Sequence, residues 1–79
     1  MAYIDMNLDS VNLNAARPFM HVLSVMEKMK PGQVLRITTN SSFEVYNFME
    51  LCKQLGHLLV ETVVWNDEYT LLLKKGWQQ

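Results

Sequence analysis

The spacing of hydrophobic residues changes from one segment of this chain to the next, and the order of these changes restricts the fold. Hydrophobic residues at every second position are typical of a half-buried strand, whereas spacings of three and four residues are typical of an amphipathic helix. The pattern predicts six elements: strand 3–8, a helix from about 14 or 15 to 30, strand 33–39, helix 42–55, strand 58–65 and strand 69–74.

Turn and capping signals separate these elements. Residues 31–32 are a Pro-Gly turn that ends the first helix. Ser41 and Glu44 fit a capping box, in which the Ser41 hydroxyl accepts a free backbone N–H and the Glu44 carboxylate reaches back to the cap. Gly56 stands where a left-handed residue is expected to end the second helix. Residues 66–68 form a short polar connection that suits a hairpin.

The element order, β-α-β-α-β-β, predicts a two-layer α/β sandwich of the α+β kind. A strand-helix-strand start implies a right-handed crossover with the first two strands parallel, and the final hairpin adds an antiparallel pair. We therefore expect a four-stranded mixed sheet with two helices on one face and the other face open to solvent. The chain has 79 residues and room for one core, so residues 1–79 are predicted to form a single domain.

Composition argues against several classes of function. The formal net charge is -1 and the basic residues are scattered, so nucleic acid is not expected as a partner. No hydrophobic run approaches the roughly 18 residues of a membrane span, and the first residues lack the features of a signal peptide, so a cytoplasmic protein is expected. His21 and His57 stand far apart and Cys52 is the only cysteine, so no metal site, disulfide or cofactor is predicted.

Several short motifs follow one another over nearly the whole chain. They are Leu8-Asp9, Asn12-Leu13, Pro31-Gly32, Cys52 and Gly56-His57, followed by a last strand that ends in Lys74. Their order resembles that of the small sulfur-carrier proteins of the TusA-like or SirA-like family. The resemblance implies the same α-β sandwich and a place in sulfurtransferase chemistry.

The segment Ala15-Ala16-Arg17-Pro18 stands where that family has a Cys-Pro-x-Pro motif at the start of the first helix. The resemblance implies that the motif cysteine carries sulfur as a persulfide, and a helix N-terminus favours the thiolate that this chemistry needs. Ala15 has no thiol, so we predict no catalytic residue at this position. Pro18 still suits the first turn of a helix. We therefore expect the helix without the enzyme activity.

Cys52 is the one thiol that the sequence retains. It belongs to a hydrophobic stripe on the second predicted helix, and burial raises the pKa of a thiol and suppresses its reactivity. Two functions stay open: a noncatalytic family member that binds another protein in sulfur trafficking, or an active sulfur carrier that uses Cys52 or a cysteine of a partner. The stripe consists of Val45, Phe48, Met49, Cys52 and Leu55.

The open face of the predicted sheet is unusually hydrophobic. If Leu58, Val60 and Val64 point toward the helices, alternation places their neighbours on the open face, although a register shift of one residue would exchange the two faces. Exposed hydrophobic patches often mark interfaces, so we expect a protein partner, from a sulfur-relay system or a second copy of this chain as a homodimer. The candidate interface residues are Leu59, Val63, Trp65, Leu72, Arg17 and Pro18.

Overall fold

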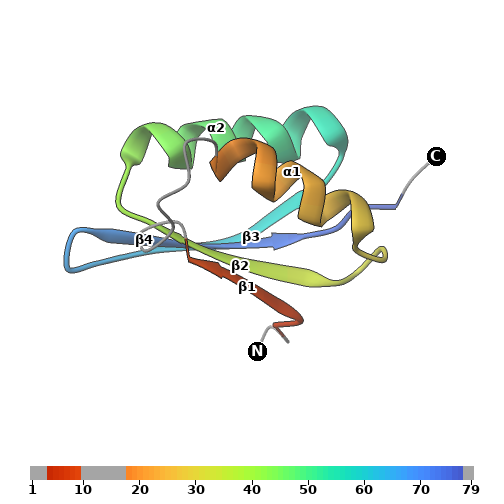
Figure 1. Ribbon diagram of the computed structural model, residues 1–79, viewed down its shortest axis with the longest axis horizontal. Coiled ribbons are helices and arrows are strands. Elements are labelled where there is room, and N and C mark those ends of the chain that lie inside the picture. Colours follow the sequence, from red (N-terminus) through yellow and green to blue (C-terminus); the bar gives the residue numbers. More distant parts are fainter. Residues whose placement is uncertain (1–3, 10–17, 78–79) are drawn as a thin grey trace.

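The computed structural model describes residues 4–9 and 18–77. They form four strands and two helices in the predicted order (Figure 1). The elements are β1 (Met6–Asp9), α1 (Pro18–Lys28), β2 (Val34–Thr39), α2 (Ser42–Leu55), β3 (Leu58–Trp65) and β4 (Glu68–Lys74). Neither helix is long and apolar enough to cross a membrane, as far as the described residues go.

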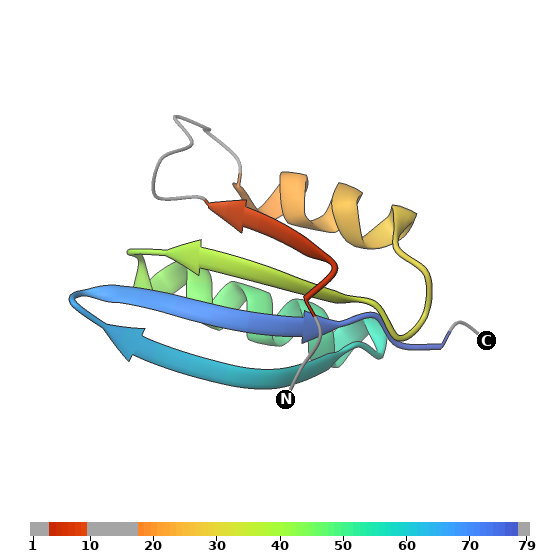
Figure 2. The same cartoon turned by 90° about the horizontal axis from the view of Figure 1, so that it is seen from below.

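The four strands form one mixed sheet in the order β1-β2-β4-β3. β1 is parallel to β2, whereas β4 is antiparallel to both β2 and β3. Both helices lie on the same face of this sheet (Figures 1 and 2). The predicted two-layer fold is therefore confirmed, with β1 and β3 as the two edges of the sheet.

β1 begins at Met6, later than the prediction of residue 3, and it extends one residue further, to Asp9. Asp5 precedes the strand and joins it to β2 in two ways. Its backbone N–H donates to the Val34 carbonyl (2.9 Å), and its carboxylate accepts the Val34 backbone N–H (2.8 Å). The side chain thus satisfies the first donor of β2, a group that would otherwise lack a partner.

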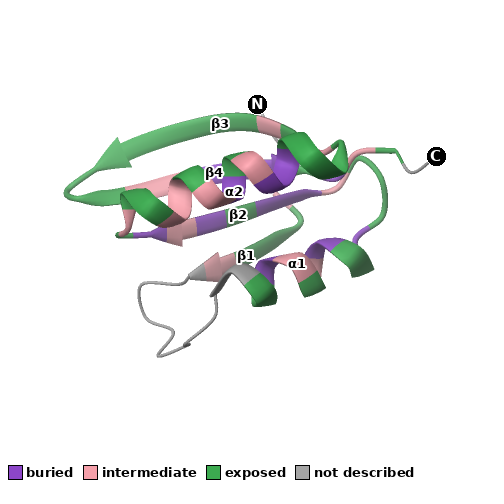
Figure 3. Cartoon of the chain, turned by 90° about the horizontal axis from the view of Figure 1, so that it is seen from above, coloured by how far each residue is buried: buried purple, intermediate pink, exposed green. Residues whose placement is uncertain are grey.

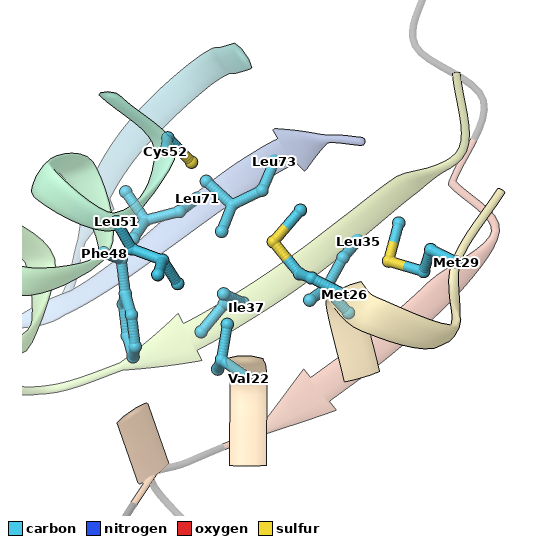
Figure 4. Close-up of a cluster of buried hydrophobic side chains, with 10 residues drawn as sticks. All are labelled: Val22, Met26, Met29, Leu35, Ile37, Phe48, Leu51, Cys52, Leu71 and Leu73. Carbon is cyan, nitrogen blue, oxygen red and sulfur yellow. The ribbon is translucent and has the colours of Figure 1, made fainter. Parts of the chain in front are cut away.

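The hydrophobic core lies between the helices and the inner face of β2 and β4 (Figure 4). Phe48 of α2 is fully buried against this layer. The prediction for the α2 stripe was wrong at two positions, because Met49 and Leu55 are exposed and Leu51 is buried in their place. The core residues are Val22, Met26, Met29, Leu35, Ile37, Phe48, Leu51, Cys52, Leu71 and Leu73.

Local hydrogen bonds fix the start of α2 close to where the sequence predicts it. The Ser41 hydroxyl accepts the Glu44 backbone N–H (3.2 Å), as expected of an N-cap. The Glu44 carboxylate accepts the Thr39 hydroxyl, and that hydroxyl in turn accepts the Ser41 backbone N–H (3.2 Å). Thr39 therefore links the end of β2 to the cap of α2.

The β3–β4 hairpin closes with a two-residue turn at Asn66 and Asp67. Both residues have positive φ, 52° and 62°, as in a type I′ turn, and Trp65 pairs directly with Glu68. The predicted polar connection is confirmed, with Glu68 already belonging to β4. The tip of this hairpin extends beyond the first turn of α2 (Figure 1).

Candidate functional site

The helix-start motif lies largely outside the described residues. This holds for Ala15, Ala16 and Arg17, so the structural expectations for them stay predictions. Pro18 is the first residue of α1. A proline suits that position because its fixed φ is helical and its missing N–H would lack a helical acceptor anyway.

Cys52 is the fourth residue from the end of α2, and its side chain is buried in the core. The side chain is 3% exposed and packs within the core cluster (Figure 4). Burial raises the pKa of its thiol to about 11, so the reactive thiolate is rare at neutral pH. The prediction of a buried structural thiol is confirmed for this residue.

The backbone of Cys52 also ends α2. Its carbonyl accepts the backbone N–H groups of Gly56 and His57, the latter at 2.8 Å. Gly56 has a left-handed φ of 76°, as predicted for the residue that terminates this helix. Cys52 is therefore fixed by its backbone as well as by its packing.

The residues after β4 join the ends of both helices. Gly76 passes so close to the end of α2 that a Cβ at this position would lie 1.9 Å from the Gly56 carbonyl oxygen. Its backbone N–H donates to Nδ1 of His57 (3.0 Å). Lys75 is buried, and its Nζ donates to the Met26 carbonyl in the last turn of α1. The Met26 carbonyl also accepts the Met29 backbone N–H (3.2 Å), so the Lys75 ammonium is a second donor to it and complements the negative end of the helix dipole.

The sequence analysis did not predict the roles of Lys75 and Gly76. A lysine directly after a strand is typical of a solvated position, and nothing near Lys75 in the sequence points to the carbonyl of Met26, which is distant in the chain. The glycine at position 76 was a usable signal, because a glycine close to the end of a strand can mark a close approach of two backbones.

A pocket of about 520 Å³ opens beside this C-terminal segment, between the ends of α1 and α2. Leu23, Met26 and Leu51 form part of its apolar wall, and His57 and Lys75 supply polar groups. Burial, and to a smaller extent the charge of Lys75, lowers the pKa of His57, which favours the neutral ring that accepts the Gly76 N–H.

None of the described residues that line this pocket has a thiol. Among the described residues, no three His, Cys, Asp or Glu side chains are grouped to hold a metal ion.

The predicted orientation of the first part of β3 was wrong. Leu59 pairs with Leu73 and packs against the core, whereas Leu58 pairs with Lys74 and faces the open side. The register shifts between Leu59 and Glu61, where a β-bulge leaves Val60 without a direct partner on β4. One extra residue reverses the alternation, so the side chains before the bulge face the opposite way from the prediction.

Beyond the bulge, the open-face assignments hold. Val63 pairs with Thr70 and is 45% exposed, and Trp65 pairs with Glu68 and is 78% exposed. Leu72 lies on the same face, between Arg36 and Glu61 of the neighbouring strands, but only 7% of its surface is exposed. The hydrophobic surface therefore follows β3 at the sheet edge and does not spread across the sheet.

Comparison with known protein families agrees with this fold. A family model described as Sulfurtransferase TusA matches residues 6–75, which is most of the chain. The matched range includes the Ala15-Ala16-Arg17-Pro18 segment, Cys52 and all of the strands and helices described above up to Lys75.

The burial of Cys52 predicts slow reaction with a neutral thiol reagent in the folded protein and fast reaction after denaturation. The physical reason is that the reagent needs access to a thiolate, and folding removes both access and ionisation. Labelling followed by intact mass measures both rates. As a control, Met49→Cys places a second thiol at an exposed position of the same helix, and only this thiol should react quickly in the native state. Equal rates for the two native thiols would contradict the assignment.

The lowered pKa of His57 predicts that the stability of the fold depends on pH. Because folding lowers its pKa below the unfolded value of about 6.5, the unfolded chain binds more protons near that pH. The free energy of unfolding should therefore be highest above about pH 7 and fall as the pH drops through 6.5. Denaturant titrations of the wild type and His57→Gln between pH 5 and 8 test this, with His21→Gln as a control for an exposed histidine. Removal of His57 should flatten the dependence, and an unchanged slope in His57→Gln would refute the linkage.

Proposed function

Because the chain belongs to the TusA sulfurtransferase family, we propose that it is a noncatalytic member that acts by binding another protein in cytoplasmic sulfur trafficking. In this proposal residues 1–79 work as one domain, without a cofactor and without a persulfide of their own. The family association with sulfur transfer supplies the pathway, and the residues of this chain supply the reason for the lost chemistry.

The observation that carries the proposal is the placement of the only thiol in the sequence. A sulfur carrier needs a thiolate that reaches the sulfane sulfur of a donor persulfide, forms a new S–S bond and releases the donor as a thiol. Ala15 has no atom for this step at the motif position. Cys52 has the atom but neither the exposure nor the ionisation, with a pKa of about 11. At pH 7 about one Cys52 thiol in ten thousand would be ionised.

A binding role is supported by the exposed side chains on β3. Val63 and Trp65 present apolar surface to solvent at the edge of the sheet, where the chain gains nothing from them as core residues. Exposed aromatic and aliphatic groups of this kind are enriched in protein interfaces. Arg17 and Pro18, at the motif, stay candidates for a second contact with a partner of the sulfur relay.

The competing function is an active carrier that uses Cys52 or a cysteine of a partner. Cys52 would then have to leave the core, because its side chain is enclosed by the residues that hold α2 on the sheet. Such an exposure would remove Cys52 from the core packing and leave a void there, which destabilises the fold. The test of the proposed function therefore measures sulfur uptake directly.

Incubation with a low-molecular-weight persulfide donor should leave the mass of the native wild type unchanged. Ala15→Cys returns a thiol to the motif position and should gain the mass of one sulfur atom, because a helix N-terminus favours the thiolate. Intact-mass spectrometry reads both results, and peptide mapping locates the added sulfur. The denatured wild type is the control, since its exposed Cys52 should react. A sulfur atom on Cys52 of the native protein would instead support the active carrier.

A further inference from the structure

Among the residues that the structure describes, no strand lies beside the outer backbone groups of β3, which makes β3 an edge strand. It is eight residues long and pairs only with β4, on its inner side. Figure 3 shows β3 along the border of the sheet, exposed over its whole length except at the half-buried Leu59 near its start. A long, apolar edge of this kind is a template for another strand, and natural proteins usually protect it with charges, prolines or bulges.

The protection on β3 is confined to its first half. The bulge lies at Val60, and the only charged residue of the strand is Glu61. After these, Val63, Val64 and Trp65 follow without a charge, a proline or a shift in register. Val64 is 62% exposed although it faces the helix side, because it lies near the hairpin tip, which extends beyond the start of α2. Both faces of this half of the strand are therefore apolar and uncovered.

We infer that residues 61–65 of β3 pair antiparallel with the same residues of a second copy of this chain, around a two-fold axis at Val63. This inference rests on the proposed binding function and names its partner. It joins two four-stranded sheets into one continuous sheet of eight strands. The interface is isologous, so it closes as a dimer and leaves no free β3 edge for further growth.

The side chains of this segment fit such a pairing. In an antiparallel pair, opposite residues share a face. A register centred on Val63 places Glu61 opposite Trp65 of the second copy, and both face the open side. Thr62 then lies opposite Val64 of the second copy, and both face the helix side. In each facing pair, therefore, both side chains lie on the same face of the sheet. The bulge at Val60 stays outside the paired segment.

Charge and the limits of the regular strand favour this register over its neighbours. A pairing centred on Glu61 would place two carboxylates opposite each other, which is unfavourable. An axis at Thr62 would draw the bulge at Val60 into the paired segment, and an axis at Val64 would place Asn66 of the turn opposite Thr62. The register centred on Val63 avoids these problems, and it places the two Val63 side chains opposite each other.

Pairing between β3 and the other edge of a second copy is less suitable. β1 is only four residues long, and short edges oppose strand addition. A β3-to-β1 contact would also be head-to-tail and would lead to open chains of molecules. The second copy of β3 offers a longer edge.

The mass of the protein in solution tests the inference, with a matched pair of variants. The wild type should approach twice the monomer mass of 9.2 kDa as its concentration rises, measured by light scattering after gel filtration. Val63→Lys should give the monomer mass at the same concentration, because two ammonium groups would face each other on the axis. Met49→Lys should dimerise like the wild type, since Met49 is equally exposed (45%) but lies on α2. Circular dichroism checks that each variant is folded.

Cysteine crosslinking tests the register without depending on the lysine variant. Val63→Cys places two thiols across the axis, where opposite Cβ atoms lie roughly 4.5–5.5 Å apart, and should form a disulfide-linked dimer under mild oxidation. Leu58→Cys is the control, because it lies on the same face of β3 but outside the paired segment. A wild type that keeps the monomer mass at all concentrations would overturn the inference, as would equal crosslinking of both variants. These outcomes leave the sulfur-uptake test of the proposed function unaffected.

Discussion

The structure depends on the packing of α2 across the two central strands of the sheet. Phe48 and Cys52 of this helix meet Leu71 and Leu73 of β4, and all four side chains are buried. In a chain this small, one such layer supplies most of the apolar burial that stabilises the fold. The only thiol of the protein therefore belongs to its main packing contact. Reactivity at Cys52 and stability of the core therefore oppose each other, because the thiol would have to leave this contact to react.

The same packing leaves β3 at the border of the molecule. α2 covers the centre of the sheet, while the hairpin extends past its first turn (Figure 1). Apolar side chains at the end of β3 consequently do little for the core and remain available to a second strand. The buried thiol of Cys52 and the exposed outer edge of β3 are the two features on which the proposed binding function rests.

Much of this fold could be predicted from the sequence because its signals are local. Alternation identified the strands, Ser41 and Gly56 marked the ends of α2, and the hairpin turn was visible in its polar residues. The orientation of Leu59 could not be predicted, since a bulge adds a residue without changing the local composition. The burial of Lys75 was also hidden, because its acceptor on Met26 is brought near only by the tertiary fold. Sequence patterns indicate which face of a segment is buried. They do not indicate the register between strands or the contacts between residues that are distant in the chain.

The central claim is that the family scaffold persists in this chain while the reacting atom is absent. The most direct measurement is the pKa of the thiol in Ala15→Cys, obtained from its alkylation rate as a function of pH, with the wild type as the control for Cys52. The free backbone N–H groups and the positive end of α1 should lower this pKa below the reference of about 8.5, with Arg17 acting in the same direction where its side chain lies close. A thiol that titrates at or above about 8.5 would contradict the claim, because the helix start would then no longer provide the environment of a carrier site.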